Sequence, residues 1–151
     1  MIIRHAQLSD IDRCVEMAVH FIEGTAYSLI LKASRVQLSQ LAAGLIEHGV
    51  IFVSETETDP GETPEVVGMM GLFLVTHPVS GSLVASEIAF WLEPTHRGGS
   101  TWKRLKSAGE RWAKENGAIG MNMIAPAGSI IAEFYRRDGY TKVEECFYKE
   151  L

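Results

Sequence analysis

The hydrophobic residues recur with two different spacings along the chain. A stripe at every third or fourth position predicts a first helix, which begins after Ser9, ends at Gly24 and presents Ile11, Val15, Ala18 and Ile22. The same spacing predicts three further helices, over residues 34–48, 100–116 and 127–137. Runs of β-branched, aromatic and other apolar residues predict strands over residues 2–4, 50–54, 65–76, 83–92, 119–124 and 142–149.

These elements follow one another in the order β-α-α-β-β-β-α-β-α-β. The three central strands are joined by connections that contain Pro and Gly, so we expect an antiparallel meander there. The fold class is therefore α+β (mixed α/β), with helices on both faces of a mixed, mostly antiparallel sheet. No linker divides the 151 residues, and we expect residues 1–151 to form a single domain.

Composition narrows the class of protein. With 46% hydrophobic and 22% charged residues, the chain has the make-up of a soluble globular domain. Its longest apolar run, residues 66–75, contains two glycines and is shorter than the ~20 residues of a membrane-spanning helix. No secretory or transit segment opens the chain, so we expect a cytoplasmic protein. A pI of about 5.5 argues against a nucleic-acid partner.

The cysteines and histidines give no sign of a metal site. The two cysteines, Cys14 and Cys146, lack the paired spacing of a zinc site, and the five histidines are scattered. We expect no metal ion. Cys14 lies inside the first predicted helix, which makes it a poor nucleophile.

Positive charge gathers at the junction between the fourth strand and the third helix. Residues 95–106 contain no acid but four basic side chains, Arg97, Lys103, Arg104 and Lys106, which favours a small polyanionic ligand. At this junction Gly98 and Gly99 would let backbone N–H groups approach a ligand at the positive end of a helix. Such a corner favours a pyrophosphate, and the alternative is a plain glycine turn before an amphipathic helix.

This junction resembles the signature R/Q-x-x-G-x-G/A of the GNAT superfamily, the acyl-CoA-dependent N-acyltransferases, and the resemblance spans essentially the whole chain. Arg97 matches the first position, whereas Ser100 and Trp102 replace the glycine and the small residue. A register shifted by one residue restores the glycine at Gly99 but loses the leading Arg or Gln. The resemblance implies a cofactor site for acetyl-CoA that holds the pyrophosphate with Arg97, Gly98, Gly99, Ser100 and Thr101, and the remaining phosphate with Lys103 or Arg104.

A second match lies on the preceding strand. Residues 86–90 are similar to the family segment that carries a general-base glutamate, which here is Glu87, the only acid between residues 76 and 92. Regular alternation would place Glu87, Ala89 and Trp91 on one face of the sheet. Burial of a lone carboxylate raises its pKa toward the range useful for a base. The alternative is an ion-paired or surface-facing carboxylate.

A third match is residues 134–140, which are similar to the family's aromatic-Tyr-x-x-x-Gly-aromatic segment. The resemblance implies that Tyr135 protonates the departing CoA thiolate, and the alternative is a half-buried tyrosine that packs beside Phe134. It also implies a pair of splayed strands, where a backbone N–H near Trp91 or Leu92 polarises the thioester carbonyl.

Together these matches imply an enzyme that transfers an acetyl group from acetyl-CoA to a primary amine by direct attack in a ternary complex. The alternative is a non-catalytic module of the same fold that binds CoA or associates with a protein. We expect residues 23–33 and 77–82 to contact a small-molecule or lysine-type acceptor. Residues 1–75 carry 4 basic and 10 acidic side chains, a net charge of -6, which mildly favours a cationic acceptor such as a polyamine or an aminoglycoside. We expect no membrane partner, and a homodimer is the commonest assembly for such domains.

Overall fold

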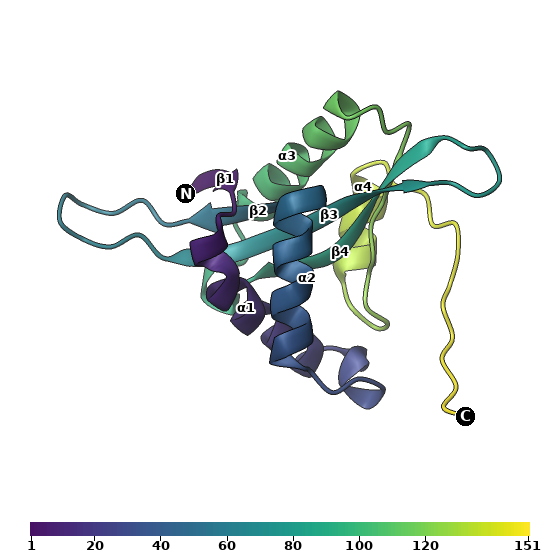
Figure 1. Cartoon of the computed structure of the whole chain (residues 1–151), viewed down its shortest axis with the longest axis horizontal. Helices are drawn as coiled ribbons and strands as arrows, with labels where there is room; N and C mark the ends of the chain where they lie inside the picture. The colour runs from purple at the N-terminus through teal and green to yellow at the C-terminus, as the bar shows by residue number, and fades with distance from the viewer.

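The computed structural model describes all residues from Met1 to Leu151 and contains a five-stranded sheet (Figure 1). The strands lie side by side in chain order, and every neighbouring pair is antiparallel except β4 and β5, which are parallel. The sheet consists of β1 (Ile2–His5), β2 (Val50–Glu55), β3 (Val66–Thr76), β4 (Leu83–Leu92) and β5 (Met121–Asn122). The predicted fold class, a mixed and mostly antiparallel sheet with helices, is therefore confirmed.

Four α-helices join these strands: α1 (Ile11–Glu23), α2 (Arg35–His48), α3 (Thr101–Glu115) and α4 (Ile131–Arg137). Local chemistry determines where they begin and end. The Ser34 hydroxyl accepts a hydrogen bond from the Gln37 N–H at the start of α2, and Gly24 ends α1 as predicted. Three short 3-10 helices, η1 (Leu8–Asp10), η2 (Ala26–Leu29) and η3 (Pro94–His96), shape the connections. None of the helices combines the length and apolar character that a bilayer crossing requires.

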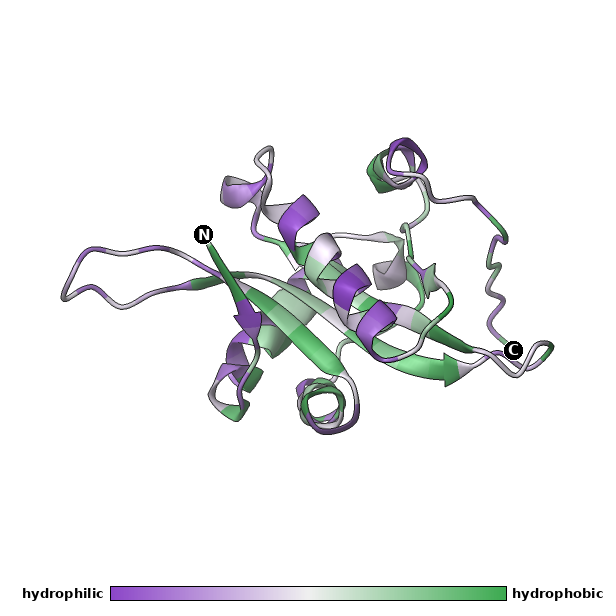
Figure 2. Ribbon diagram, turned by 90° about the horizontal axis from the view of Figure 1, so that it is seen from above, coloured by the Kyte–Doolittle hydropathy of each residue, from purple (hydrophilic) through white to green (hydrophobic).

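The helices bury both faces of the sheet. Seen from above, α2 lies on one side of the sheet and α4 on the other (Figure 2). On the side of α1 and α2, Met17 and Leu45 pack against Val53 and Met69 of the sheet. On the opposite side α3 contributes Leu105 and Ala108 to a second cluster, which contains Val50, Phe52, Met70 and Leu72. The apolar stripes that predicted these helices are therefore the faces that the core buries.

The C-terminal part of the chain departs from the predicted strands. Strand β5 extends over only two of the six expected residues, and residues 142–149, expected as a final strand, pair with no other segment. In Figure 1 the chain after α4 runs away from the sheet to its C-terminus. Val143 and Phe147 there are 80% and 89% exposed. Strand-forming composition alone does not produce a strand, because a strand also needs a neighbour with which to exchange hydrogen bonds.

Candidate active site

The pairing between strands β4 and β5 ends close to the middle of β4. Their parallel pairing is confined to Ala85 with Met121 and Ser86 with Asn122. Beyond Ser86, β4 continues for six residues along β3 without a partner on its other side. The backbone of residues 87–92 therefore has no strand partner on that side, and we refer to this unpaired edge of β4 beyond the end of β5 as the opening.

A β-bulge determines which side chain enters this opening. Gly71 of β3 faces Ala89, but the next residue, Leu72, faces Glu87, so Ile88 is an extra residue in β4. Glu87 therefore shares the face of Leu72, on the side of α3, whereas Ile88, Ala89 and Trp91 pack toward α1 and α2. The expectation that Glu87, Ala89 and Trp91 share one face was wrong, because the bulge interrupts the alternation on which it rested.

Glu87 is a buried carboxylate with a single protein partner. Only 4% of the residue is exposed, and one carboxylate oxygen accepts a hydrogen bond of 2.8 Å from the Ile124 N–H just after β5. Burial raises the pKa of Glu87 to about 7, although this hydrogen bond opposes the shift. The side chain is thus neither ion-paired nor surface-facing, and it titrates in the range that suits a general base at neutral pH.

Tyr135 reaches the same peptide segment from α4. Its side chain is buried, and its hydroxyl donates a long hydrogen bond of 3.4 Å to the Ile124 carbonyl. Burial and the nearby charge of Glu87 both raise the pKa of Tyr135, which keeps the phenol protonated. The backbone of Ile124 therefore connects the two predicted catalytic side chains. Sequence patterns gave no indication of Ile124, because it contributes only its peptide groups.

Six consecutive backbone N–H groups lie free at the start of α3. The Arg97 N–H donates to the Pro94 carbonyl and the Arg104 N–H to the Ser100 carbonyl, but the N–H groups of residues 98–103 donate to no protein acceptor. The Ser100 side chain does not cap the helix either. Free donors at the positive end of a helix form a site for an anion.

The two glycines keep this corner open. Gly98 has a φ of +93°, a backbone conformation that residues other than glycine rarely adopt. A methyl group placed on Gly98 or Gly99 would meet no other atom within 4 Å, so the space beside the Cα atoms of both glycines is empty of protein. Several turn glycines share these properties, so what sets this corner apart is the run of free N–H groups that follows it.

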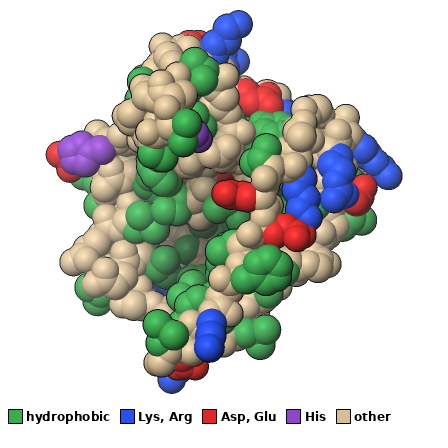
Figure 3. All heavy atoms as spheres, turned by 90° about the vertical axis from the view of Figure 1, so that its right-hand side faces the viewer, with side chains coloured by type: hydrophobic (Ala, Val, Ile, Leu, Met, Phe, Trp, Pro, Cys, Tyr) green, Lys and Arg blue, Asp and Glu red, His purple; other side chains and the backbone are tan.

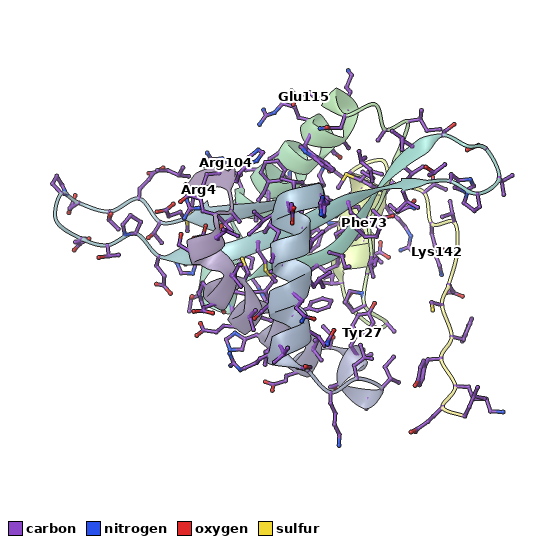
Figure 4. The ribbon with its side chains drawn as sticks, in the orientation of Figure 1. Arg4, Tyr27, Phe73, Arg104, Glu115 and Lys142 are labelled. Atoms are coloured by element: carbon purple, nitrogen blue, oxygen red, sulfur yellow. The ribbon has the colours of Figure 1, made fainter.

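The neighbouring basic side chains differ in where they point. The Arg97 guanidinium lies 4.5 Å from the centre of the Trp91 ring, and its Nε donates to the Leu92 carbonyl. Lys103 lies over the Trp102 ring, at the first turn of α3. Arg104 instead donates to the Met1 carbonyl at 2.7 Å, on the side of β1, where Figure 4 labels it. Of the two residues expected for the remaining phosphate, Lys103 is thus the one without a competing backbone partner.

Backbone alternation distinguishes Trp91 from Leu92. The Glu93 N–H donates to the Val67 carbonyl of β3, so the backbone groups of Trp91, two residues earlier, also face β3. Those of Leu92 face away, and its carbonyl accepts the hydrogen bond from Arg97 there. The Leu92 N–H therefore faces the opening. The Trp91 indole packs near Phe21 of α1, and its Nε1 has no hydrogen-bond partner.

Solved structures resemble this chain over nearly its whole length. A Trypanosoma brucei acetyltransferase is 20% identical, with a TM-score of 0.72 and 99% of both chains covered. An aminoglycoside N-acetyltransferase in complex with CoA is 15% identical, with a TM-score of 0.75 and 99% and 93% covered. The chain has the GNAT acetyltransferase fold. A Bacillus halodurans protein named as a transcriptional regulator shares it, at 17% identity, a TM-score of 0.77 and 99% coverage of both chains. No family model and no curated relative matches the sequence.

Trp102 is the main departure from the family pattern within this acetyltransferase fold. Its ring lies 5.5 Å from that of Phe134, so it joins the start of α3 to α4. The same two helices are joined further along by Lys106, which pairs with Glu110 of α3 and with Asp138 after α4. The large residue therefore contributes to the packing between the two helices, and the N–H groups around it remain unbonded.

Other candidate chemistry lies outside this opening. The Cys14 thiol is buried, and burial raises its pKa to about 12, so it stays protonated and is not nucleophilic. The structure brings together no group of three or more His, Cys, Asp or Glu side chains that could hold a metal ion.

Proposed function

We propose that the protein transfers an acetyl group from acetyl-CoA to a primary amine by direct attack in a ternary complex. The observation that carries this proposal is the run of six unbonded N–H groups in residues 98–103, which lies one short connection after the opening beside β4. The free N–H groups thus follow the end of β4, and the buried carboxylate of suitable pKa lies on the same strand, five residues before its last residue, Leu92. The GNAT fold supports acetyl transfer as the reaction that uses both.

The chain's own groups suit CoA. Residues 98–103 would donate N–H groups to the pyrophosphate, and the positive end of α3 would favour its charge. The free nitrogens of the Arg97 guanidinium, held in place through Nε, would reach the same phosphates, and Lys103 would bind the remaining phosphate. When bound, acetyl-CoA supplies the thioester, and residues of the protein bind it and move the protons.

Glu87 would act as the base. An alkylammonium ion has a pKa near ~10.4 and is almost fully protonated at neutral pH, so a proton must be removed before its nitrogen can attack. Glu87, ionised above its pKa of about 7, would accept that proton directly or through a water molecule. No acyl-enzyme is needed, since the amine nitrogen bonds to the thioester carbon itself.

The Leu92 N–H and Tyr135 would act on the other side of the reacting carbon. The N–H faces the opening and would stabilise the negative charge that develops on the carbonyl oxygen. As the carbon–sulfur bond breaks, the Tyr135 hydroxyl would give its proton to the sulfur. The nitrogen loses two protons in all: Glu87 would pass the first to solvent and accept the second after the attack, and the second would restore the Tyr135 hydroxyl, so that the products are the amide, the CoA thiol and one proton released to solvent. The tyrosine pKa is raised, but burial raises the pKa of a leaving thiolate in the same pocket as well, which favours the transfer.

The acceptor is expected to be a small amine or a lysine side chain. That one structural neighbour is named as an aminoglycoside N-acetyltransferase supports a small-molecule acceptor. The second candidate is a non-catalytic module that binds CoA or a protein partner, because one neighbour is named as a transcriptional regulator. Calorimetry with acetyl-CoA, followed by thiol release with a panel of amines, separates the two. Tight binding of CoA without turnover of any amine would favour the second.

The anion site itself is tested by a matched pair of glycine substitutions. Gly98→Ala and Gly61→Ala both place a methyl group in open space on a backbone of positive φ, at +93° and +102°. Each should cost about 1 kcal/mol of stability through backbone strain. Only Gly98→Ala should also weaken acetyl-CoA binding, by about tenfold or ~1.4 kcal/mol, because only Gly98 shapes the free N–H groups. Equal affinities for the two variants would contradict the site.

A further inference from the structure

An apolar depression lies on the other side of β4 from the anion site. It has a volume of about 320 Å³ and lies between α2 and strands β3 and β4. Figure 3 shows this end of the molecule hollowed, with hydrophobic side chains on its walls. Four of its six lining residues are hydrophobic and none is charged; they are Gln40, Leu41, Gly44, Leu45, Phe73 and Ile88.

The depression deepens toward the core of the domain. Leu41, Leu45 and Ile88 also line a smaller cavity of about 30 Å³, which lies under α2 and reaches Cys14 of α1. All but one of the residues that line this inner cavity are hydrophobic. For scale, an enclosed apolar cavity of ~150 Å³ holds benzene. The outer depression is therefore large enough for a phenyl ring or a short alkyl chain.

The depression is lined by Ile88, the residue that follows the proposed base in the chain. Ile88, the extra residue of the β4 bulge, points into the depression, while its neighbour Glu87 points to the opposite face. Because β4 has no strand partner beyond Ser86, these residues lie at an edge of the sheet. Figure 4 shows Phe73 and Tyr27 on the same side of α2. Tyr27 belongs to η2, which precedes α2 in the chain.

The six lining residues carry no charge. The connection of residues 24–34 contains Lys32 as its only charged side chain, and residues 77–82 contain no Asp, Glu, Lys or Arg. An acceptor with several ammonium groups would need carboxylates for the groups that do not react, because an unpaired buried charge is costly. Although residues 1–75 are acidic as a whole, none of their acids lines the depression.

We propose that this depression binds the apolar body of the acceptor, so that the preferred substrate is a primary monoamine with an alkyl or aryl group. The inference rests on the proposed acetyl transfer. The ammonium group would lie at the open edge of β4 near Glu87, and the apolar group would lie against Leu41, Phe73 and Ile88. The favoured acceptors thus differ from the polyamine or aminoglycoside that the overall charge suggested.

A series of amines tests the substrate class. With acetyl-CoA saturating, kcat/KM should rise about fourfold for each methylene added from ethylamine to hexylamine, since each buried methylene contributes about 0.8 kcal/mol. Phenylethylamine should be a good substrate, and spermidine and a lysine-containing peptide poor ones. A flat series, or a preference for spermidine or the peptide, would overturn the inference while leaving the proposed acetyl transfer in place.

A substitution on α2 tests the location. Gly44 lines the depression, and a methyl group placed there meets no atom within 4 Å, so Gly44→Phe should fill the depression without disturbing the fold. We expect KM for hexylamine to rise at least about tenfold, with the rate for ethylamine unchanged. Val36→Phe is the matched control: Val36 is an exposed residue of α2 outside the lining, and both amines should react as before. An unchanged KM in Gly44→Phe would overturn the location.

Measuring amine binding in the absence of turnover allows the acceptor site to be tested separately from the proposed acetyl transfer. If no amine is acetylated, the proposed function fails, and saturation-transfer NMR with phenylethylamine in the absence of acetyl-CoA then decides the inference. Binding that Gly44→Phe abolishes and Val36→Phe preserves would support the depression as an amine site. No binding to the unmodified protein, or equal binding by both variants, would overturn it.

Discussion

The two outer edges of the sheet are built in opposite ways. At one edge all four residues of β1 pair with β2, and Arg4 ties the strand to Asp10 and to Glu55 through charged hydrogen bonds. At the other edge only two residues of β5 pair with β4, and the buried acid beside them, Glu87, has no cationic partner. At the β1 edge, ion pairs between side chains hold the strand in place. At the β5 edge, backbone and carboxylate groups are left available for other partners.

The same contrast appears in the two buried acids. Arg4 and the Gln7 N–H hold the pKa of Asp10 below its usual range, so this carboxyl is stabilised in its charged form. Burial raises the pKa of Glu87 to about 7, so its charged form is disfavoured. A site that exchanges protons needs the second kind of environment, and a structural ion pair needs the first. The β1 edge thus stabilises the charged form of its acid and the β5 edge disfavours the charged form of Glu87, as our proposed base requires.

Removing the charge of Glu87 should have the largest effect. Glu87→Gln keeps an oxygen for the Ile124 N–H but cannot accept the proton of the amine. We expect turnover to fall by about 10²–10⁴-fold and the rise of rate through pH 7 to flatten, with acetyl-CoA affinity unchanged. Glu55→Gln, at the β1 edge, is the control and should leave turnover as it was. Stopped-flow thiol release across pH 5–9 measures both, and an unaltered pH profile in Glu87→Gln would remove Glu87 from the mechanism.

The two acids should also give the protein opposite dependences of stability on pH. The folded pKa of Glu87 is about 7 against an ordinary value of 4.5, so its contribution to stability is present below pH 4.5 and lost as the pH rises through 7. At pH 8, Glu87→Gln should therefore recover up to about 3 kcal/mol of unfolding free energy that the ionised carboxylate costs. Urea denaturation at pH 5 and pH 8 measures this gain, which should be smaller at pH 5.

Asp10→Asn should behave in the opposite sense. Because its folded pKa is lowered, Asp10 contributes stability above its ordinary value of 3.8, and that stability is lost as the pH falls. The variant should be destabilised most near pH 7 and least near pH 3. If both variants showed the same pH dependence, the two edges would not differ electrostatically as the structure indicates.

Tyr135→Phe should have a smaller effect on turnover than Glu87→Gln. The variant loses one hydroxyl from the opening but keeps the ring and its contact with Tyr140. We expect turnover to fall by about 10–100-fold, because water can supply the proton to the thiolate less efficiently. Tyr140→Phe is the matched control: its hydroxyl donates to Glu110 at 2.8 Å, so its loss should affect stability and leave kcat unchanged. Equal losses of kcat in both variants would show that Tyr135 acts only through packing.

Patterns within a short stretch of sequence predicted most of the fold. The stripes over residues 34–48 and 100–116 correspond to α2 and α3 within one residue at each end, because helix periodicity and capping are local. The runs at 50–54, 65–76 and 83–92 likewise correspond to β2, β3 and β4. The glycine corner was also found from local signals, since Gly98 and Gly99 directly precede the helix whose N–H groups they expose.

Features that depend on distant partners were not predicted. The bulge at Ile88 depends on how β4 pairs with Gly71 and Leu72 of β3, so it reversed the face of Glu87 without any local sign. The hydrogen bond from the Ile124 N–H to Glu87 spans 37 positions and involves a backbone group that any residue possesses. The sequence therefore identified Glu87 as an unusual carboxylate within an apolar strand, but the face on which it lies and its hydrogen-bond partner are known only from the structure.

The smallest effect should come from the segment after α4, which extends the comparison of the two edges. Truncation after Thr141 removes Val143, Phe147 and Leu151, all at least 80% exposed, so little apolar area returns to water. We expect the unfolding free energy to change by less than about 0.5 kcal/mol, as for surface changes in general. Chemical denaturation of the truncated and full chains measures the difference. A loss of several kcal/mol would mean that residues 142–149 pair as a strand in solution and close the β5 edge as firmly as β1 closes the other.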